Sequence, residues 1–271
     1  MSDLTRWRGW TALVTGASAG IGAEMARLLA AAGCDVVLTA RREERLQVLA
    51  GELSEKHGVK AEVIASDLAA LDGPKKLMAE LDARELAVDV LVNNAGVGLV
   101  GPMLDNTSEA ELRMVQLNVM AVVELTHVLA CRMVERGRGH VVQVGSMAAF
   151  LPVPRMATYA ATKHFIGAYG EALAYELRGS PVGVTTIHPG GTKSEFSETA
   201  GMQLPDAISK TMMTSAQVAK IGLVAAARGR RSIVTGFMNV AQVFLFRLVP
   251  TRLLVWIGDT IYKKLQGEPA T

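Results

Sequence analysis

The chain has 271 residues and a formal net charge of +2, from 28 basic and 26 acidic side chains. This near balance excludes the concentrated basic surface that an electrostatic nucleic-acid binder needs. Half of the residues are hydrophobic and 20% are charged, which excludes wholesale disorder and predicts a sizeable core. At this length we expect a single domain over residues 1–271.

The two cysteines, Cys34 and Cys131, lie far apart and lack the spacing of metal ligands. The sequence therefore predicts neither a disulfide framework nor a metal site. The first ten residues lack the apolar run of a signal peptide, and no uninterrupted apolar run reaches the ~18–20 residues of a membrane span. We therefore expect a reducing, cytoplasmic setting.

Short runs rich in Val, Ile and Leu alternate along the chain with longer amphipathic stretches. The runs predict seven strands, at Thr11–Thr15, Val36–Ala40, Ala61–Ala65, Val88–Asn93, His140–Gly145, Val184–His188 and Ser232–Thr235. The stretches between them predict helices, for example at Glu24–Ala32, Glu43–Lys56, Glu109–Glu135 and Thr158–Leu177. Continuously apolar strands separated by helices are typical of a parallel sheet that is buried on both faces.

These elements predict an α/β fold: a doubly wound parallel sheet, or Rossmann fold, of about seven strands with helices on both faces. An eight-stranded α/β barrel is the alternative at this length, but the count is one strand short. Two regions depart from the alternation of strands and helices. Residues 191–214 are interpreted as a mobile lid, and residues 237–265 as an apolar C-terminal appendage of helices.

The first predicted strand runs directly into a glycine-rich loop at Thr15–Gly22, and a helix follows at once. Glycines permit a tight turn and a close approach of the backbone to a pyrophosphate, and the helix N-terminus offers free N–H groups. We expect nucleotide contacts from Gly16, Ser18, Ala19, Gly20, Ile21 and Gly22. A plain strand-to-helix turn remains the alternative for this loop alone.

Two later strand ends carry residues suited to the same nucleotide. Asp67, followed by Leu68, ends the third strand, where its carboxylate could accept a hydrogen bond from an adenine amino group. Asn94, Ala95 and Gly96 follow the fourth strand and could form a floor under the cofactor. Open α/β sheets bind ligands at this edge. A helix cap and an ordinary turn are the respective alternatives.

The end of the second strand indicates which nucleotide binds. An NAD site would place an acidic residue about 20 residues beyond the glycine loop, to hold the ribose 2′-hydroxyl. Here the strand ends in Arg41 and Arg42. Guanidinium groups suit a 2′-phosphate, so NADP is favoured over NAD. The alternative is that both arginines are solvated residues at the start of an exposed helix.

Ser146 ends the fifth strand, and Tyr159 and Lys163 follow in one predicted helix. Side chains at i and i+4 share a helix face, which can bring the ammonium close to the phenol. An ordinary tyrosine has a pKa of ~10, too high for an efficient base near neutrality. A positive charge ~4 Å away would lower that pKa by roughly three units before desolvation is subtracted.

The ordered motifs resemble those of a short-chain dehydrogenase/reductase of the single-domain type, over about residues 8–236. The resemblance rests on the T-G-x-x-x-G-x-G loop at 15–22, Asp67, N-N-A-G at 93–96, Asn118, Ser146, Y-x-x-x-K at 159–163 and Pro189-Gly190. It implies that Tyr159 exchanges a proton with the substrate oxygen and that Ser146 hydrogen-bonds that oxygen. It also implies that Lys163 lowers the tyrosine pKa and binds the nicotinamide ribose, while Asn118 holds a water of the proton relay.

The resemblance also implies that the turn after the sixth strand contacts the nicotinamide carboxamide. The expected contacts there are Pro189, Gly190, Gly191 and Thr192. Ser194 stands where many relatives have threonine, which leaves the hydroxyl partner open. His164 and His188 are interpreted as structural.

The predicted lid is rich in Met, Leu, Ile and Phe, which suits an adaptable apolar pocket. We expect a hydrophobic ketone or aldehyde and the corresponding alcohol as substrates; packing of the lid onto the core is the alternative. The C-terminal appendage has apolar residues at helical spacing with basic neighbours. It can close a pocket, contact another subunit, lie on a membrane surface or join the core.

The sequence thus predicts an NADP-dependent oxidoreductase that transfers hydride, with tyrosine as general acid and base. We expect a homodimer or homotetramer, cytoplasmic, with peripheral membrane contact through the C-terminal helices as one option. An NAD-dependent alcohol dehydrogenase of the same family is one alternative function. The other is a nucleotide-binding redox sensor or scaffold without turnover.

Overall fold

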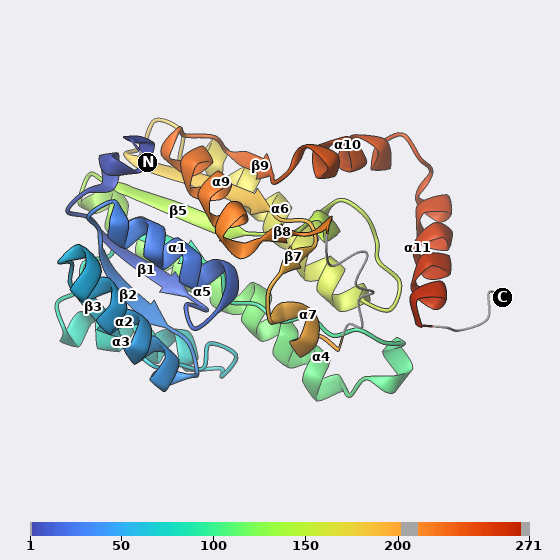
Figure 1. Cartoon of the computed structure of the whole chain (residues 1–271), viewed down its shortest axis with the longest axis horizontal. Coiled ribbons are helices and arrows are strands. Elements are labelled where there is room, and N and C mark those ends of the chain that lie inside the picture. The colour runs from blue at the N-terminus through green and yellow to red at the C-terminus, as the bar shows by residue number, and fades with distance from the viewer. Residues whose placement is uncertain (1, 202–210, 267–271) are drawn as a thin grey trace.

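The computed structural model describes residues 2–201 and 211–266, which are built around one parallel sheet (Figure 1). Its seven strands lie in the order β3-β2-β1-β4-β5-β6-β9. They are β1 (Thr11–Thr15), β2 (Asp35–Thr39), β3 (Ala61–Val63), β4 (Val90–Asn93), β5 (Gly139–Val144), β6 (Val182–His188) and β9 (Ser232–Val234). Every neighbouring pair is parallel. The predicted fold class and all seven strands are confirmed, and the barrel alternative is excluded.

Helices cover both faces of the sheet, because alternate strand residues point to opposite sides. Val14 and Leu38 pack in one cluster with side chains of α1 (Gly20–Ala31), α2 (Glu43–His57) and α9 (Ser215–Ala227). Leu13 and Val37 pack in the other with side chains of α3 (Gly73–Ala83), α5 (Ala121–Glu135) and α6 (Ala157–Glu176). The hydrophobic core therefore has two layers, one on each side of the sheet.

The predicted helix at Glu109–Glu135 is continuous but changes its winding. It consists of α4 (Ser108–Val115), a π-helical turn at Gln116–Met120 and α5. Within the described residues it is the helix long and apolar enough to cross a membrane. Leu125, Leu129 and Met133 pack in the core beside the sheet, which accounts for its apolar composition.

The predicted lid contains elements that the sequence pattern did not reveal. Strand β7 (Thr192–Lys193) pairs in parallel with β8 (Met213–Thr214), and α7 (Phe196–Thr199) lies between them in the chain. Residues 202–210 of the lid lie outside the described residues. The C-terminal appendage forms α10 (Phe237–Phe246) and α11 (Thr251–Gln266), which project beyond β9 at the right of Figure 1.

One buried hydroxyl joins the first and fourth strands at their carboxyl ends. Thr15 is 1% exposed, and its Oγ1 donates to the carbonyl of Val92 at 3.1 Å. The same oxygen accepts the backbone N–H groups of Asn94 and Ala95, each at 3.0 Å. The Asn94 side chain adds a hydrogen bond between the same two segments, because its Nδ2 donates to the carbonyl of Thr15 at 2.9 Å. This network fixes the glycine loop against the segment that follows β4.

We expect Thr15→Val to lower the free energy of unfolding by about 1–3 kcal/mol, since it leaves the Ala95 N–H without an acceptor and removes one of the two acceptors of the Asn94 N–H. Thr39 offers a matched control: it pairs with Thr15 in register and is 0% exposed, and its hydroxyl has no partner among the described residues. Thr39→Val should therefore change stability by less than about 1 kcal/mol. Urea denaturation of both variants measures the difference; equal losses would contradict the role given to Thr15.

Candidate active site

A cavity of about 770 Å³ opens at the carboxyl ends of the strands, within the size range of small-molecule sites. It is lined by segments that follow β1, β2, β3, β4, β5 and β6 and by the lid. Most residues predicted from the sequence line it: Gly16, Ser18, Ala19, Gly20, Ile21, Arg41, Arg42, Asp67, Leu68, Asn94, Ala95, Gly96, Ser146, Tyr159, Lys163, Pro189, Gly190, Gly191 and Thr192. Gly22 and Asn118 do not belong to this lining.

The glycine loop has the features that a diphosphate requires. Gly16 and Gly20 adopt φ values of +65° and +60°, which favour glycine. Helix α1 begins at Gly20 without a side-chain cap, and Ser18–Ile21 line the cavity. The N–H groups of its first turn are therefore open to an anion.

Gly22 serves packing rather than the cavity wall. A Cβ on this residue would lie 2.4 Å from Asn94 Nδ2 and 2.5 Å from the carbonyl oxygen of Gly16. Only a glycine lets the first turn of α1 approach the loop and Asn94 this closely. Its place in the loop motif is thus explained by contacts within the chain.

Arg42 reaches the cavity rim, but a lid carboxylate meets it there. Its Nη1 lies 2.7 Å from Glu195 Oε2, and its Nη2 donates to Ser18 Oγ at 3.0 Å. Arg45 Nη1 lies 2.6 Å from the other oxygen of Glu195. Hydrogen bonds from Arg42 and then Arg45 hold the pKa of Glu195 below its usual value. Sequence reasoning missed Glu195, because 153 residues separate it from Arg42.

Asp67 is also engaged by a residue that the motifs did not identify. Its Oδ1 accepts the N–H of Ala69 at 3.1 Å, and its Oδ2 pairs with Arg113 of α4, which lines the cavity too. Burial works to raise the pKa of Asp67, but the hydrogen bonds and the charges of Arg113 and Arg41 lower it overall. The carboxylate is therefore ionised, with Arg113 beside it at the wall.

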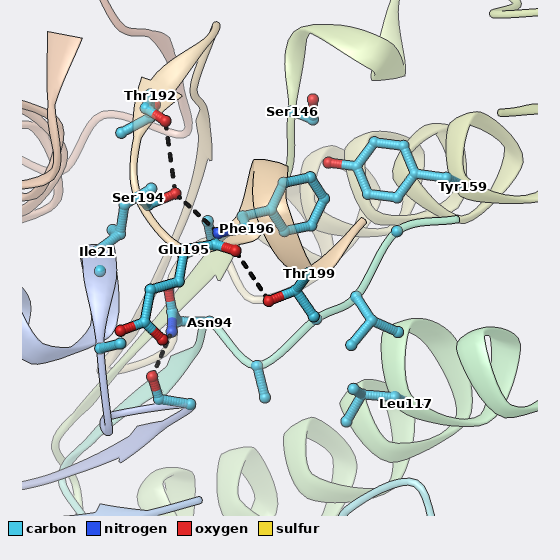
Figure 2. A pocket seen from close by; sticks show the side chains of 18 of the residues that line it. Ile21, Asn94, Leu117, Ser146, Tyr159, Thr192, Ser194, Glu195, Phe196 and Thr199 are labelled. Carbon is cyan, nitrogen blue, oxygen red and sulfur yellow. Dashed lines mark hydrogen bonds between the residues drawn. The ribbon is translucent and has the colours of Figure 1, made fainter. Parts of the chain in front are cut away.

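Ser146 and Tyr159 place two hydroxyl groups together in the cavity (Figure 2). Ser146 follows β5 in extended conformation, and Tyr159 lies in the first turn of α6. Burial raises the pKa of Tyr159, which is 8% exposed, and a hydrogen bond with Ser146 opposes that rise. The pair is close enough to hold one substrate oxygen between them.

Lys163 lies one turn beyond Tyr159 and donates a hydrogen bond to the backbone. Its Nζ donates to the carbonyl of Val144 at 2.9 Å and lies 5.8 Å from the centre of the Tyr159 ring. Burial lowers the pKa of Lys163 to about 8. The lowering of the tyrosine pKa by Lys163 that the i, i+4 spacing predicts is not found: burial raises the pKa of Tyr159, and the opposing hydrogen bond comes from Ser146.

Asn118 lies in the π-helical turn and ties two parts of the site together. Its Nδ2 donates to the carbonyl of Val97 at 2.9 Å and to Thr162 Oγ1 at 3.1 Å, and its Oδ1 accepts the Val97 N–H at 3.0 Å. Its side chain therefore holds the segment after β4 against α6. The water-holding role implied by the resemblance stays a prediction.

The wall around Tyr159 is apolar. The Phe196 ring of the lid lies 5.5 Å from the Tyr159 ring, centre to centre, and the two are seen side by side in Figure 2. Met156 and Met114 are buried in the same cluster, with Val97 and Leu99 packed against it. Met156 was not singled out from the sequence; its position three residues before Tyr159 was the available signal.

The turn after β6 is supported from below by residues outside the motifs. A Cβ on Gly190 would lie 2.4 Å from Asn239 Nδ2 of α10, so this side chain packs directly under the turn. Thr192 Oγ1 donates to the carbonyl of Gly190 at 2.9 Å. His188 is buried beneath Ser146: its Nδ1 lies 3.2 Å from the Ser146 carbonyl oxygen, and burial lowers its pKa to about 4. A neutral imidazole there positions the Ser146 backbone.

Comparison with known proteins gives one consistent result. Residues 10–204 match the short chain dehydrogenase family. A short chain dehydrogenase of Pseudocercospora fijiensis is 37% identical over 70% of this chain and 62% of its own length. The chain thus spans less than two thirds of that relative.

Solved structures extend the likeness to the whole fold. A short-chain dehydrogenase from Sphingobium yanoikuyae in complex with NADPH is 30% identical, with a TM-score of 0.78 over 89% of this chain and 96% of that one. A 7β-hydroxysteroid dehydrogenase is 27% identical, with a TM-score of 0.81 over 90% and 94% of the two chains. Solved neighbours hold NADPH, NADP or NADH.

The buried lysine predicts how stability depends on pH. Because the pKa of Lys163 falls from 10.5 to about 8 on folding, the unfolded chain binds more protons between these values, and stability should rise with pH. The gain relative to Lys163→Met should approach roughly 3 kcal/mol by pH 10.5. Denaturation of the protein without added nucleotide, from pH 7.5 to 10.5, measures it. The exposed Lys75→Met variant is the control and should keep the wild-type slope, whereas an equal slope in Lys163→Met would contradict burial as the cause.

Proposed function

Because the chain belongs to the short-chain dehydrogenase/reductase family, we propose that it is an NADP-dependent oxidoreductase that interconverts a hydrophobic ketone or aldehyde and the corresponding alcohol. The observation that carries this proposal is a shared cavity. Ser146 and Tyr159 line it at an apolar wall, and the glycine loop and Arg42 line its other end. One cavity therefore offers a place for both the nucleotide and the carbonyl group.

The residues present fit a dinucleotide. The uncapped start of α1 suits the diphosphate, Arg42 suits a 2′-phosphate, and the turn at Pro189–Thr192 lines the same cavity as Lys163. A bound nicotinamide supplies or accepts the hydride. The protein itself has to orient the substrate and transfer the proton.

In the reducing direction, the hydroxyl of Tyr159 donates its proton to the carbonyl oxygen, and Ser146 donates a hydrogen bond to the same oxygen. In the oxidising direction, Tyr159 accepts the proton of the alcohol. The nearby charge of Lys163 favours the tyrosinate that forms on proton transfer. Since the pKa of Lys163 is about 8, the lysine is mostly charged at neutral pH.

The proposed substrate class rests on the wall around Tyr159. Val97, Leu99, Met156 and Phe196 surround the phenol, and Met212 adds a flexible side chain from the lid. Such a wall favours an apolar substituent beside the carbonyl group, since a polar one would lose its hydration there. The solved 7β-hydroxysteroid dehydrogenase, whose fold is similar, acts on a compound of this kind.

Location and assembly are further parts of the proposal. A cytoplasmic setting is supported by the two cysteines, both of which are free. A homodimer or homotetramer is supported by exposed apolar side chains on the helices of one face, among them Val134 of α5 and Phe165 and Tyr175 of α6.

Tyr159→Phe should lower turnover by about 10²–10⁴-fold, because it removes the proton donor while keeping the ring against Phe196. An NADPH-oxidation screen across hydrophobic ketones, aldehydes and 3-oxoacyl thioesters identifies the substrate, and kcat of the variant is then compared on it. Binding of NADPH should be unchanged in the same variant. Full activity would refute the mechanism, and nucleotide binding without turnover of any carbonyl compound by the wild type would favour a redox sensor or scaffold.

Arg42→Met should weaken NADP binding by about ten- to a hundredfold and leave NAD binding nearly unchanged, since it removes a charge-assisted contact with the 2′-phosphate. Arg45→Met is the matched control. It also loses a bond to Glu195, but Arg45 lies outside the cavity lining, so NADP affinity should stay close to that of the wild type. Calorimetric titrations of the wild type and both variants with NADP and with NAD measure these affinities. Tighter binding of NAD than NADP by the wild type would favour the NAD-dependent alternative.

A further inference from the structure

The C-terminal helices carry a large share of the exposed apolar side chains. We call this the C-terminal apolar surface, and its exposed members are Phe237, Met238, Val240, Phe244, Leu245, Leu248, Leu253, Trp256 and Ile257. They make up nine of the eighteen large hydrophobic side chains that are exposed among the described residues. So many within one short segment form a patch, and patches of this kind mark a binding surface.

Helix α10 presents this surface outward. Phe237, Phe244 and Leu245 are 84%, 65% and 55% exposed, whereas Val243 is 7% exposed. On the side toward the body, Asn239 donates to the carbonyl of Thr235 and packs under Gly190. A helix of a water-soluble protein normally turns its apolar side to the core. Here most of that side faces outward, so an apolar partner outside the fold would cover it.

Helix α11 continues the surface and is attached to the body through charged groups. Asp259 pairs with Arg155 at 3.3 Å and with Lys263 at 2.9 Å. Leu253, Trp256 and Ile257 are exposed on the same helix. Their spacing of i, i+3 and i+4 puts them on one face. Figure 1 shows both helices projecting from the sheet and its covering helices, which leaves them accessible to an extended partner.

The charges of this segment indicate which partner fits. Residues 232–258 contain no acidic side chain. Arg247, at the end of α10, and Arg252, in the first turn of α11, are both exposed. Among the described residues neither guanidinium has a carboxylate partner. The surface therefore combines apolar side chains with two free positive charges at the joint between its helices.

A second copy of the chain is a poor match for such a surface. In a two-fold interface the same patch meets itself, so apolar side chains would be covered but arginines would face a segment without acidic residues. Anionic phospholipid headgroups supply the missing negative charge, and the acyl region beneath them accepts the apolar side chains. An exposed tryptophan such as Trp256 is also typical of the membrane–water interface.

We propose that the C-terminal apolar surface binds the headgroup region of an anionic lipid bilayer, with α10 and α11 lying in the membrane plane. Phe237, Phe244 and Trp256 insert toward the acyl chains, and Arg247 and Arg252 pair with lipid phosphates. The attachment is peripheral, because neither helix is long enough to span a bilayer.

The test measures co-sedimentation of the full chain with phosphatidylcholine vesicles and with matched vesicles that contain phosphatidylglycerol. Wild-type protein should sediment with the anionic vesicles, and binding should weaken as salt is raised. Trp256 is a built-in reporter, since it is 61% exposed whereas Trp7 is 1% exposed. Its emission should shift to shorter wavelength with anionic vesicles, and Trp256→Phe should lose the shift but keep sedimenting.

Two sets of variants separate the contribution of the apolar side chains to vesicle binding from that of the two arginines. Phe244→Glu combined with Leu245→Glu should reduce the bound fraction at least about tenfold, whereas Leu104→Glu, at a residue 92% exposed elsewhere on the surface, should not. Arg247→Gln and Arg252→Gln should each lower the affinity for anionic vesicles about fivefold and leave the weak binding to neutral vesicles unchanged.

Two results would overturn the proposal. One is equal sedimentation of the wild type and the Phe244/Leu245 double variant with anionic vesicles. The other is no vesicle binding together with a wild-type dimer, measured by light scattering, that the same double variant converts to monomer; this would assign the surface to a second copy. Circular dichroism of the double variant shows that it is folded before either result is accepted.

Discussion

The site depends on how closely the end of β4 approaches the turn after β1. The chain winds from β1 outward through β2 and β3, then returns to β4 and continues through β5 and β6, so β1 and β4 are adjacent where the winding direction reverses. At that point Thr15 Oγ1 hydrogen-bonds three backbone groups of the segment at the end of β4. The Asn94 side chain donates to the backbone of Thr15. Gly22 permits this contact because any Cβ would collide with Asn94. The glycine loop and the segment after β4 are therefore held together by one hydrogen-bond network.

Burial then sets the chemistry of the opposite wall. It raises the pKa of Tyr159 and lowers those of Lys163 and His188, so each group is driven toward its neutral form. The two lowered pKa values leave His188 and Lys163 in different charge states at neutral pH. With a pKa of about 4, His188 is neutral across the physiological range and serves as a fixed support for Ser146. Lys163, with a pKa of about 8, is mostly charged at neutral pH.

Sequence patterns predicted what depends on local spacing. Buried strands have continuous apolar runs, and all seven were located; the Y-x-x-x-K spacing placed Tyr159 and Lys163 on one helix that lines the cavity. Contacts between distant segments left no such signal. The pairing of Glu195 with Arg42, the position of Asn239 under Gly190 and the two-residue strands β7 and β8 all depend on how the lid folds back. The roles implied by the resemblance, such as that of Asn118, remain predictions because they require bound molecules.

The lid contacts two parts of the molecule that lie far apart in the sequence: the segment after β2 and the start of the C-terminal helices. On one side Glu195 ties it to Arg42 and Arg45 of the nucleotide end. At its base, β8 lies against the start of α10, where a Cβ on Gly236 would be 3.0 Å from Met213 Sδ. Asn239 of α10 supports the turn at Gly190 from the same position. Asn239 and Val243 turn toward the body, so the inner side of α10 packs against the turn after β6, which lines the cavity. Helix α10 is therefore part of the scaffold of the cavity.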